Sequence, residues 1–145
     1  LSVQPQNVAI VDKTEDTPQF NVDEVKMCCS FINIFRNAFD AMPNGGELQV
    51  LSEVKAKIIT FSFIDNGCGM TKETIEKLWT PLFTTKAKGM GFGMVICKRN
   101  VKAHGGRISS FSSNASVSAC PRELIQATTT SAPCVFRWKA ASTIA

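Results

Sequence analysis

The sequence has no apolar run that approaches the roughly 18 residues needed to span a membrane. Its first residues lack the basic head and apolar core of a secretory signal peptide. Tyrosine is absent, and His104 is the only histidine. These absences exclude a membrane-embedded chain and give no sign of secretion. We therefore expect a soluble, cytoplasmic domain that forms part of a longer chain.

The six cysteines form no CxxC motif, and a single histidine supplies no cluster of metal ligands. A disulfide framework is typical of small secreted proteins. We therefore expect thiols that act as small apolar residues in a reducing compartment, rather than a zinc site or a disulfide-stabilised fold.

The composition is typical of one globular domain, which we predict to span residues 1–145. The chain is 44% hydrophobic and 19% charged. Residues 1–65 carry five basic against nine acidic side chains, and residues 66–145 carry eleven against three. The basic second half suggests an anionic partner, either a phosphate ligand or a nucleic acid. Because that half has few aromatic residues for base stacking, we do not expect nucleic acid binding.

The first half of the chain predicts an edge strand within residues 2–11 and then a long helix. Asn21 followed by Glu24 resembles a capping box, and Pro43 and the glycines after it end the helix. The predicted buried stripe of this helix comprises Val25, Cys28, Ile32, Phe35, Phe39 and Met42.

Two runs, 47–54 and 57–65, predict an antiparallel hairpin in which Ile59, Phe61 and Phe63 share one face. Thr71 is placed to cap a short helix over 72–79, and residues 80–92 read as a loop. A helix over 93–103 should bury Met94, Cys97 and Val101, and strands should follow at 107–112 and near 135–138. This order predicts an α/β fold, with helices on one face of a mixed or antiparallel sheet.

Three polar patterns can carry chemistry. In the first, Asn33 and Asn37 lie four residues apart on one helix face, with Asp40 on the same stripe. Their side-chain oxygens suit a hard cation such as Mg²⁺, which retains water and phosphate oxygens as its other ligands. A solvated polar border of the helix is the alternative interpretation.

The second pattern, Asp65 to Met70, follows the second strand of the hairpin. A carboxylate fixed at a strand end can accept a hydrogen bond from an exocyclic amine such as that of adenine. Gly67 and Gly69 would let the backbone approach a flat ring. An ordinary turn at a strand end is the alternative.

The third pattern runs from Phe83 through three alternate glycines into a helix. Amide groups at a helix start can bind an anion, and two lysines add positive charge. A glycine loop without a ligand is the alternative. The residues concerned are Lys86, Lys88, Gly89, Gly91 and Gly93.

Together, and in this order, the patterns resemble the ATP-binding domain of the GHKL superfamily, named for gyrase, a heat-shock chaperone, histidine kinases and MutL. Residues 33–42 look like its N box, 65–69 its G1 box, 83–86 the kinase F box and 89–93 the G2 box. The resemblance covers residues 20–112 and is greatest to sensor histidine kinases of the nitrogen-regulation and sporulation type.

The resemblance implies a two-layer α/β sandwich with a mobile ATP lid, and ATP and Mg²⁺ as cofactors. It implies that Asn37 ligates Mg²⁺ with Asn33 assisting, and that Asn37 and Lys86 are the catalytic residues. The implied nucleotide-binding residues are Asn33, Asn37, Asp40, Asp65, Gly67, Gly69, Met70, Lys86, Lys88, Gly89, Gly91 and Gly93.

Superfamily members that hydrolyse ATP carry a Glu where this chain has Asn33, and an amide is a poor general base. Phosphoryl transfer is therefore favoured over hydrolysis. His104 is expected to be structural, either capping its helix or lining the base of the lid. The acceptor histidine would then belong to a dimerisation domain of the parent kinase, which in turn serves a response regulator. The isolated domain should be monomeric.

Two other functions remain open at this point: a GHKL-type serine kinase or anti-sigma regulator, and a non-catalytic nucleotide-sensing module. The resemblance also weakens after Gly106, beyond which the chain has no glycine. Residues 113–145 therefore diverge from the family pattern, through a diverged tail or a change of reading frame.

Overall fold

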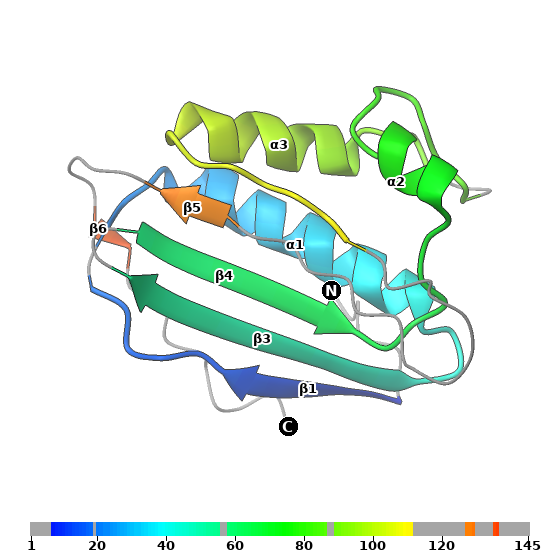
Figure 1. Ribbon diagram of the computed structural model, residues 1–145, viewed down its shortest axis with the longest axis horizontal. Coiled ribbons are helices and arrows are strands. Elements are labelled where there is room, and N and C mark those ends of the chain that lie inside the picture. Colours follow the sequence, from blue (N-terminus) through cyan, green and yellow to red (C-terminus); the bar gives the residue numbers. More distant parts are fainter. Residues whose placement is uncertain are drawn as a thin grey trace.

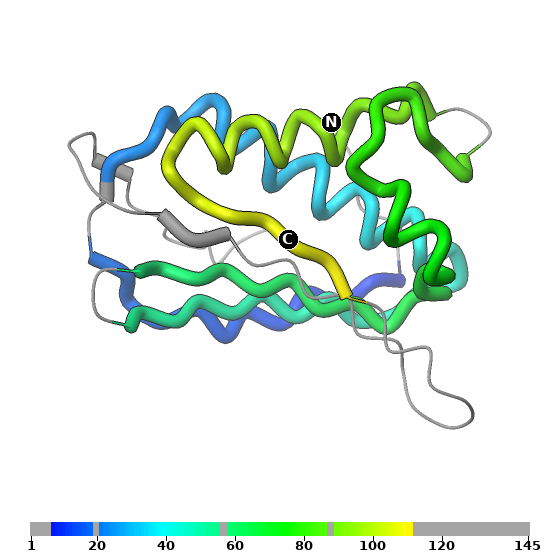
Figure 2. The backbone as a smooth tube through the Cα atoms, turned by 45° about the horizontal axis from the view of Figure 1, so that its top comes forward, coloured from blue at the N-terminus to red at the C-terminus, as the bar shows by residue number. Residues whose placement is uncertain are grey.

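The computed structural model describes residues 7–18, 20–55, 58–86, 89–111, 127–129 and 135–136. Helices cover one face of a mixed β-sheet, so the described residues form two layers (Figures 1 and 2). The elements are β1 (Val8–Lys13), β2 (Phe20–Asn21), α1 (Glu24–Ala41), β3 (Gly46–Lys55), β4 (Ile58–Asp65), α2 (Lys72–Lys77), α3 (Gly93–Ala103), β5 (Ala127–Thr129) and β6 (Val135–Phe136).

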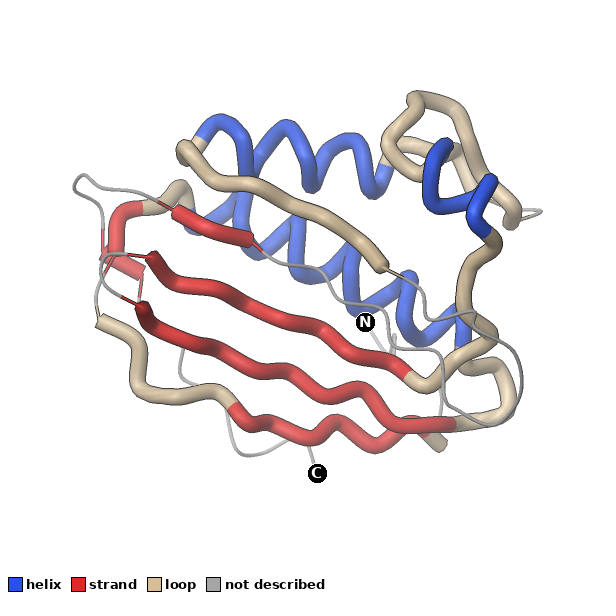
Figure 3. Tube along the Cα trace, in the orientation of Figure 1, coloured by secondary structure: helices blue, strands red, loops and turns tan. Residues whose placement is uncertain are grey.

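The main sheet has the strand order β1-β3-β4-β5, in which β1 runs parallel to β3 and the other pairs are antiparallel (Figure 3). The register pairs Leu48 of β3 with Asp65 of β4, so β4 ends beside the start of β3. A second, two-stranded sheet pairs β2 with β6. The predicted α/β sandwich with a mostly antiparallel sheet is confirmed.

The core is an aromatic cluster between α1 and β4. Phe31 packs edge-on against Phe61 and tilts against Phe63, with ring centroids 5.4 and 5.5 Å apart. Phe35 meets Phe63 at 5.5 Å. Burial of such rings supplies much of the hydrophobic stabilisation of a small domain, and it fixes the rotation of α1 on the sheet. The expectation that Ile59, Phe61 and Phe63 share the inner face of β4 is confirmed.

The start of α1 and its buried face both differ from the sequence expectation. Asp23, not Asn21, caps the helix, because its carboxylate accepts the N–H of Lys26 at 3.1 Å. Hydrogen bonds from Lys26 also hold the pKa of the Asp23 carboxyl below its usual value.

The buried face of α1 comprises Met27, Ser30, Phe31, Ile34, Ala38 and Phe39. By contrast, Val25 and Ile32 of the predicted stripe are 72% and 58% exposed. The helix is apolar around more than half of its circumference, so spacing alone did not fix which part faces the sheet.

The second half of the chain follows the expectation closely up to His104. α3 has the predicted bounds and buries Met94, Cys97 and Val101, and Thr71 caps α2, which ends two residues before the predicted boundary. The strand expected at 107–112 is absent from the described residues 107–111. Instead β5, which was not anticipated, pairs with residues 59–61 on the outer edge of β4.

The late strand is confirmed as β6, although residues 137–138 lie outside the described residues. Within the described part of the chain, no helix is both long enough and apolar enough to cross a bilayer.

Candidate functional site

The C-terminal half of α1 presents three polar side chains at its surface. Asn33 and Asn37 are half-buried and Asp40 is exposed, whereas Ile34 and Ala38 between them are buried. The packing of those apolar residues turns the polar stripe away from the sheet. The predicted placement of Asn33, Asn37 and Asp40 along one stripe of the helix is therefore present in the fold.

The loop after β4 lies directly against the end of α1. The N–H of Cys68 donates to the carbonyl oxygen of Ala41, the last residue of the helix, at 3.0 Å. A Cβ atom at Gly67 would lie 2.7 Å from both the Cβ and the carbonyl oxygen of Ala41. No side chain fits there, so glycine at 67 is required for this contact. The contact brings the loop within one helical turn of Asn37.

Asp65 is fixed at the entry to this loop. It is the last residue of β4 and only 5% exposed, and its Oδ1 accepts the N–H of Gly67 at 2.9 Å. The neighbouring Asn66 accepts the N–H of Glu47 at 2.8 Å, which ties the loop to the start of β3. A carboxylate held in this way is oriented before any ligand arrives.

Lys86 reaches the same surface of α1 from the segment between α2 and α3. Its ammonium donates to Asn37 Oδ1 and to Asp40 Oδ2, both at 2.7 Å. The Lys86 N–H donates to Thr84 Oγ1 at 3.0 Å, which shapes the turn that presents the lysine. A residue 46 positions away in sequence thus bridges the two polar side chains of α1.

The N-terminus of α3 completes the arrangement. A Cβ atom at Gly93, its first residue, would lie 3.5 Å from Asn33 Oδ1. No side chain caps this end of α3, so amide groups of its first turn remain available for an anion. Gly91 has a φ of 69°, and a Cβ there would lie 2.5 Å from the carbonyl carbon of Leu82. The chain can make this close crossing only with glycine.

Three segments therefore contact α1 along about 12 Å of its length, from Asn33 to Ala41, at 1.5 Å per residue. Asn33 faces the start of α3, Asn37 and Asp40 hold Lys86, and Ala41 supports the loop that carries Asp65. Chemically, the surface combines oxygen donors for a cation, amides for an anion and a fixed carboxylate.

Comparison with known families gives one match that spans most of the chain. Residues 23–132 match the family described as histidine kinase-, DNA gyrase B- and HSP90-like ATPase. The chain belongs to this family. The resemblance to the GHKL superfamily is thereby confirmed.

Individual members of the ATPase family are also similar to the chain. Sporulation kinase C of Bacillus subtilis is 36% identical over 96 residues, which are 66% of this chain and 22% of that protein. Sensor histidine kinase ZraS of Escherichia coli strain K12 is 30% identical over 91 residues, 63% of this chain and 20% of that protein.

Among solved structures, the catalytic domain of histidine kinase ThkA superposes with a TM-score of 0.71 at 25% identity, covering 85% of this chain and 78% of that one. The chain thus spans about a fifth of the two curated relatives, and most of a catalytic domain of a histidine kinase.

The remaining predicted site residues fall into two groups. Gly69, with a φ of 69°, and half-buried Met70 lie in the loop after β4, and Gly89 donates its N–H to the carbonyl oxygen of Lys86 at 3.2 Å. Lys88 lies outside the described residues.

Sequence reasoning missed Ala41 and Thr84, which position the loop and Lys86. The available signal was their place within residues 33–42 and 83–86, the stretches that resemble the N box and the F box.

His104 is structural, and it lies at the opposite end of α3 from Gly93. Its Nε2 accepts the N–H of Asp23 at 2.8 Å, and its Nδ1 lies 2.7 Å from the carbonyl oxygen of Asn100. The ring therefore caps α3 and joins it to the start of α1. The alternative expectation, that His104 lines the base of the lid, is wrong, because ten residues of α3 lie between His104 and Gly93.

Proposed function

We propose that the chain is the ATP-binding catalytic domain of a sensor histidine kinase, which transfers the γ-phosphoryl group of ATP to a histidine on a separate dimerisation domain. The observation that carries the proposal is that the other three motif segments all contact the stretch of α1 that carries the first. Membership of the ATPase family and similarity to sporulation kinase C and ZraS support the same function.

The adenine ring would bind beside Asp65. Its carboxylate, buried and already fixed by the N–H of Gly67, has a second oxygen that can accept the exocyclic amine. Gly67, Gly69 and Met70 would form the walls of the base pocket. A base held at this place would leave the phosphates pointing along α1 toward Asn37.

The phosphate end would bind between Asn37 and the start of α3. The amides of Gly91 and Gly93 would contact phosphate oxygens, and Lys86, Lys88 and Gly89 would add charge and donors nearby. Asn37 and Lys86 would be the catalytic residues, because phosphoryl transfer depends on positioning and charge neutralisation.

The residues present fit a magnesium ion. Asn37 Oδ1 and Asp40 Oδ2 already converge on one cationic group, the Lys86 ammonium, at 2.7 Å each. Amide and carboxylate oxygens are the ligands that Mg²⁺ takes in proteins. Asn37 would be the principal ligand, with Asn33 assisting. When bound, Mg²⁺ would neutralise charge on the phosphate oxygens during transfer.

Asn33 supports transfer rather than hydrolysis. It occupies the position where hydrolysing superfamily members carry a Glu, and its carboxamide cannot accept a proton from water at neutral pH. The side chain lies against Gly93 of α3, where it can bind and orient but not activate a nucleophile.

The acceptor histidine would be supplied by another domain of the parent kinase. Both ring nitrogens of His104 are engaged, and His104 lies about 16 Å along α3 from Gly93. The phosphoryl group would pass from the acceptor histidine to a response regulator, and we expect the isolated domain to be monomeric.

Calorimetric titration tests the site directly. ADP and ATP should bind with Mg²⁺ and more weakly without it. Asn37→Ala should weaken only the Mg²⁺-dependent part, whereas Asp65→Ala should weaken ADP binding under both conditions, by about tenfold or more. Equal and negligible effects of both changes would contradict the site.

Transfer is tested with γ-labelled ATP and a supplied histidine-containing dimerisation domain. Label should appear on that domain and not on this chain. The His104→Ala variant is the matched control and should still transfer label. Label on the isolated chain that disappears in His104→Ala would overturn the proposal.

A further inference from the structure

The ammonium group of Lys86 lies between two side-chain oxygens of α1. Its ammonium lies 2.7 Å from Asn37 Oδ1 and 2.7 Å from Asp40 Oδ2, two oxygens presented by one helical turn. Among the described residues, no other hydrogen bond or ion pair is recorded for either side chain. Both oxygens therefore accept a hydrogen bond from the same lysine ammonium.

The contact is built into the fold rather than being a chance meeting of long side chains. The turn before Lys86 is fixed by Thr84 Oγ1, and the carbonyl oxygen of Lys86 accepts the N–H of Gly89. The lysine side chain is 39% exposed, so it is accessible to displacement by an ion from solvent.

We propose that Lys86 is an internal counter-cation, which pairs with the Asn37 oxygen proposed to ligate the metal and with the Asp40 carboxylate, and which is exchanged for the divalent cation when nucleotide binds. The inference rests on the proposed function, because it requires that Asn37 ligate the metal of a nucleotide complex.

The physical basis is that two cations cannot share the same pair of oxygens. An ammonium and a divalent ion at hydrogen-bonding distance from Asn37 Oδ1 repel each other strongly in a partly buried site. Lys86 and the metal are therefore antagonists at this place. Without metal, Lys86 remains and supplies the positive charge that the phosphates require. With metal, Lys86 leaves Asp40 and is free to turn toward the phosphate oxygens.

Competition between Lys86 and the metal can be measured by ADP binding. The ratio of the ADP dissociation constant in EDTA to that in Mg²⁺ reports how much the metal helps binding. In the unaltered chain, Lys86 partly replaces the metal, so the ratio is moderate. Without the lysine, no cation replaces the metal beside Asn37, so metal-free binding weakens and the ratio rises. ADP is the probe because it has no γ-phosphate for Lys86 to contact.

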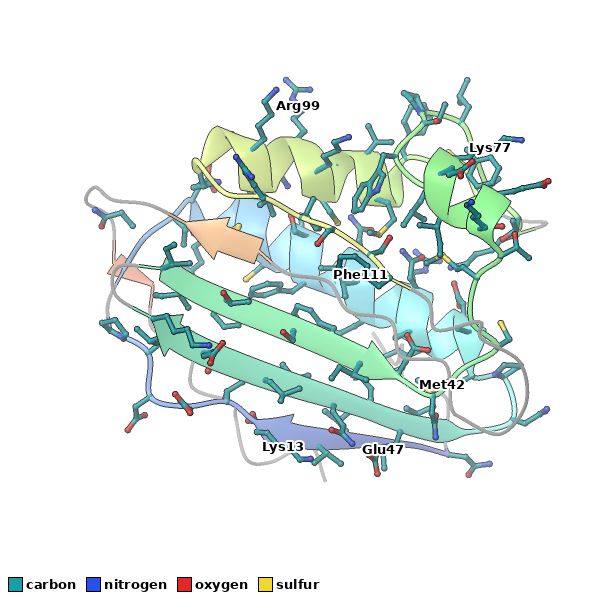
Figure 4. The ribbon with its side chains drawn as sticks, viewed as in Figure 1. Lys13, Met42, Glu47, Lys77, Arg99 and Phe111 are labelled. Carbon is teal, nitrogen blue, oxygen red and sulfur yellow. The ribbon has the colours of Figure 1, made fainter. Side chains whose placement is uncertain are left out.

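The experiment compares calorimetric titrations of ADP in Mg²⁺ and in EDTA for the unaltered chain and Lys86→Met. The expected result is a ratio about tenfold larger in Lys86→Met, the scale of one charge-assisted hydrogen bond. Lys77→Met is the matched control, because Lys77 is an exposed lysine of α2 (Figure 4), and its ratio should equal that of the unaltered chain. An unchanged or smaller ratio in Lys86→Met would overturn the inference.

A second measurement needs no nucleotide. Asp40→Asn removes the charge that anchors Lys86, so backbone amides of 83–86 should exchange with deuterium severalfold faster than in the unaltered chain. Unchanged deuterium exchange would contradict the proposal that the pairing of Lys86 with Asp40 holds this segment. Failure of the proposed function gives a different result: the unaltered chain would then bind no ADP, either in Mg²⁺ or in EDTA.

Discussion

The two halves of α1 make different kinds of contact. At the N-terminal half, buried side chains of α3 form hydrogen bonds with α1. At the C-terminal half, the contact is made by a half-exposed lysine from the segment between α2 and α3. Asn100 Nδ2 donates to Lys26 O at 3.0 Å and to Ser30 Oγ at 3.1 Å. Cys97 Sγ donates to Ser30 O at 3.4 Å. At the other half, Lys86 and Asp40 pair while 39% and 44% exposed.

The difference separates stability from ligand binding along one helix. Buried, fully paired polar groups are costly to disrupt, whereas exposed ion pairs contribute little and exchange easily with solvent ions. The N-terminal half of α1 therefore anchors α3, and the C-terminal half holds its polar groups in an exposed contact that solvent ions can replace. Under the proposed function, the second kind of contact suits a site that must admit and release a nucleotide.

The largest expected effect is a difference in alkylation rate between Cys97, which is buried between α3 and α1, and the exposed thiols of Cys29 and Cys68. Burial raises the pKa of the Cys97 thiol to about 11, against smaller opposing effects of hydrogen bonds to Ser30 and Asn33. At pH 8 only about one Cys97 in a thousand would be thiolate, the form that reacts. Cys29 and Cys68, both exposed, should be alkylated more than about a hundredfold faster, as measured by peptide mass spectrometry. Comparable rates for Cys97 would mean that the interface opens readily.

The next effect is on stability. Asn100→Ala removes two hydrogen bonds from the anchored end, so the free energy of unfolding should fall by about 1–3 kcal/mol. Urea unfolding followed by circular dichroism measures it. The adjacent Arg99 points away from the sheet (Figure 4), so Arg99→Ala should stay within about 0.5 kcal/mol of the unaltered chain. A large loss of ADP affinity in Asn100→Ala, with the free energy of unfolding unchanged, would contradict the assignment of stability to the N-terminal half of α1 and of ligand binding to its C-terminal half.

A smaller effect is expected when ADP is added during alkylation of two exposed thiols, one near each end of α1. Cys68 lies in the loop that carries Asp65, and Cys29 lies on the anchored half of α1. Saturating ADP should slow alkylation of Cys68 severalfold and leave Cys29 unchanged, because only Cys68 adjoins the proposed base pocket. Equal protection of both thiols, or of neither, would argue against a ligand confined to the C-terminal half.

The smallest effect is expected for Lys86 itself. Lys86→Met breaks a half-exposed ion pair, so the free energy of unfolding should change by less than about 1 kcal/mol. The same urea titration measures it. A loss as large as that of Asn100→Ala would show that the lysine contact is structural, and that the two halves of α1 do not differ in kind.

Local signals in the sequence were sufficient for much of the fold. Gly93 and Gly105 bracket α3, and alternation in β4 places Phe61 and Phe63 inside. The bounds of α3 and the inner face of β4 follow from these patterns alone. The N box, the loop at Asp65 and the glycines before α3 were each identified by residue type and spacing.

Features that depend on partners distant in sequence were not predictable. The buried face of α1 is set by the aromatic rings of β4, because Val25 and Ile32 are as apolar as the residues that are buried. β5 pairs with the edge of β4, whereas the later strands were expected at 107–112 and near 135–138. The contact of Lys86 with Asp40 spans 46 residues, and no local pattern indicates it.

The most direct test of the central claim is a crystal structure of the chain with ADP and Mg²⁺. The account predicts that the adenine amine lies within hydrogen-bonding distance of Asp65, with the metal on Asn37 Oδ1 and Lys86 displaced from it. A purine bound elsewhere, or a nucleotide whose metal does not contact Asn37, would contradict the account.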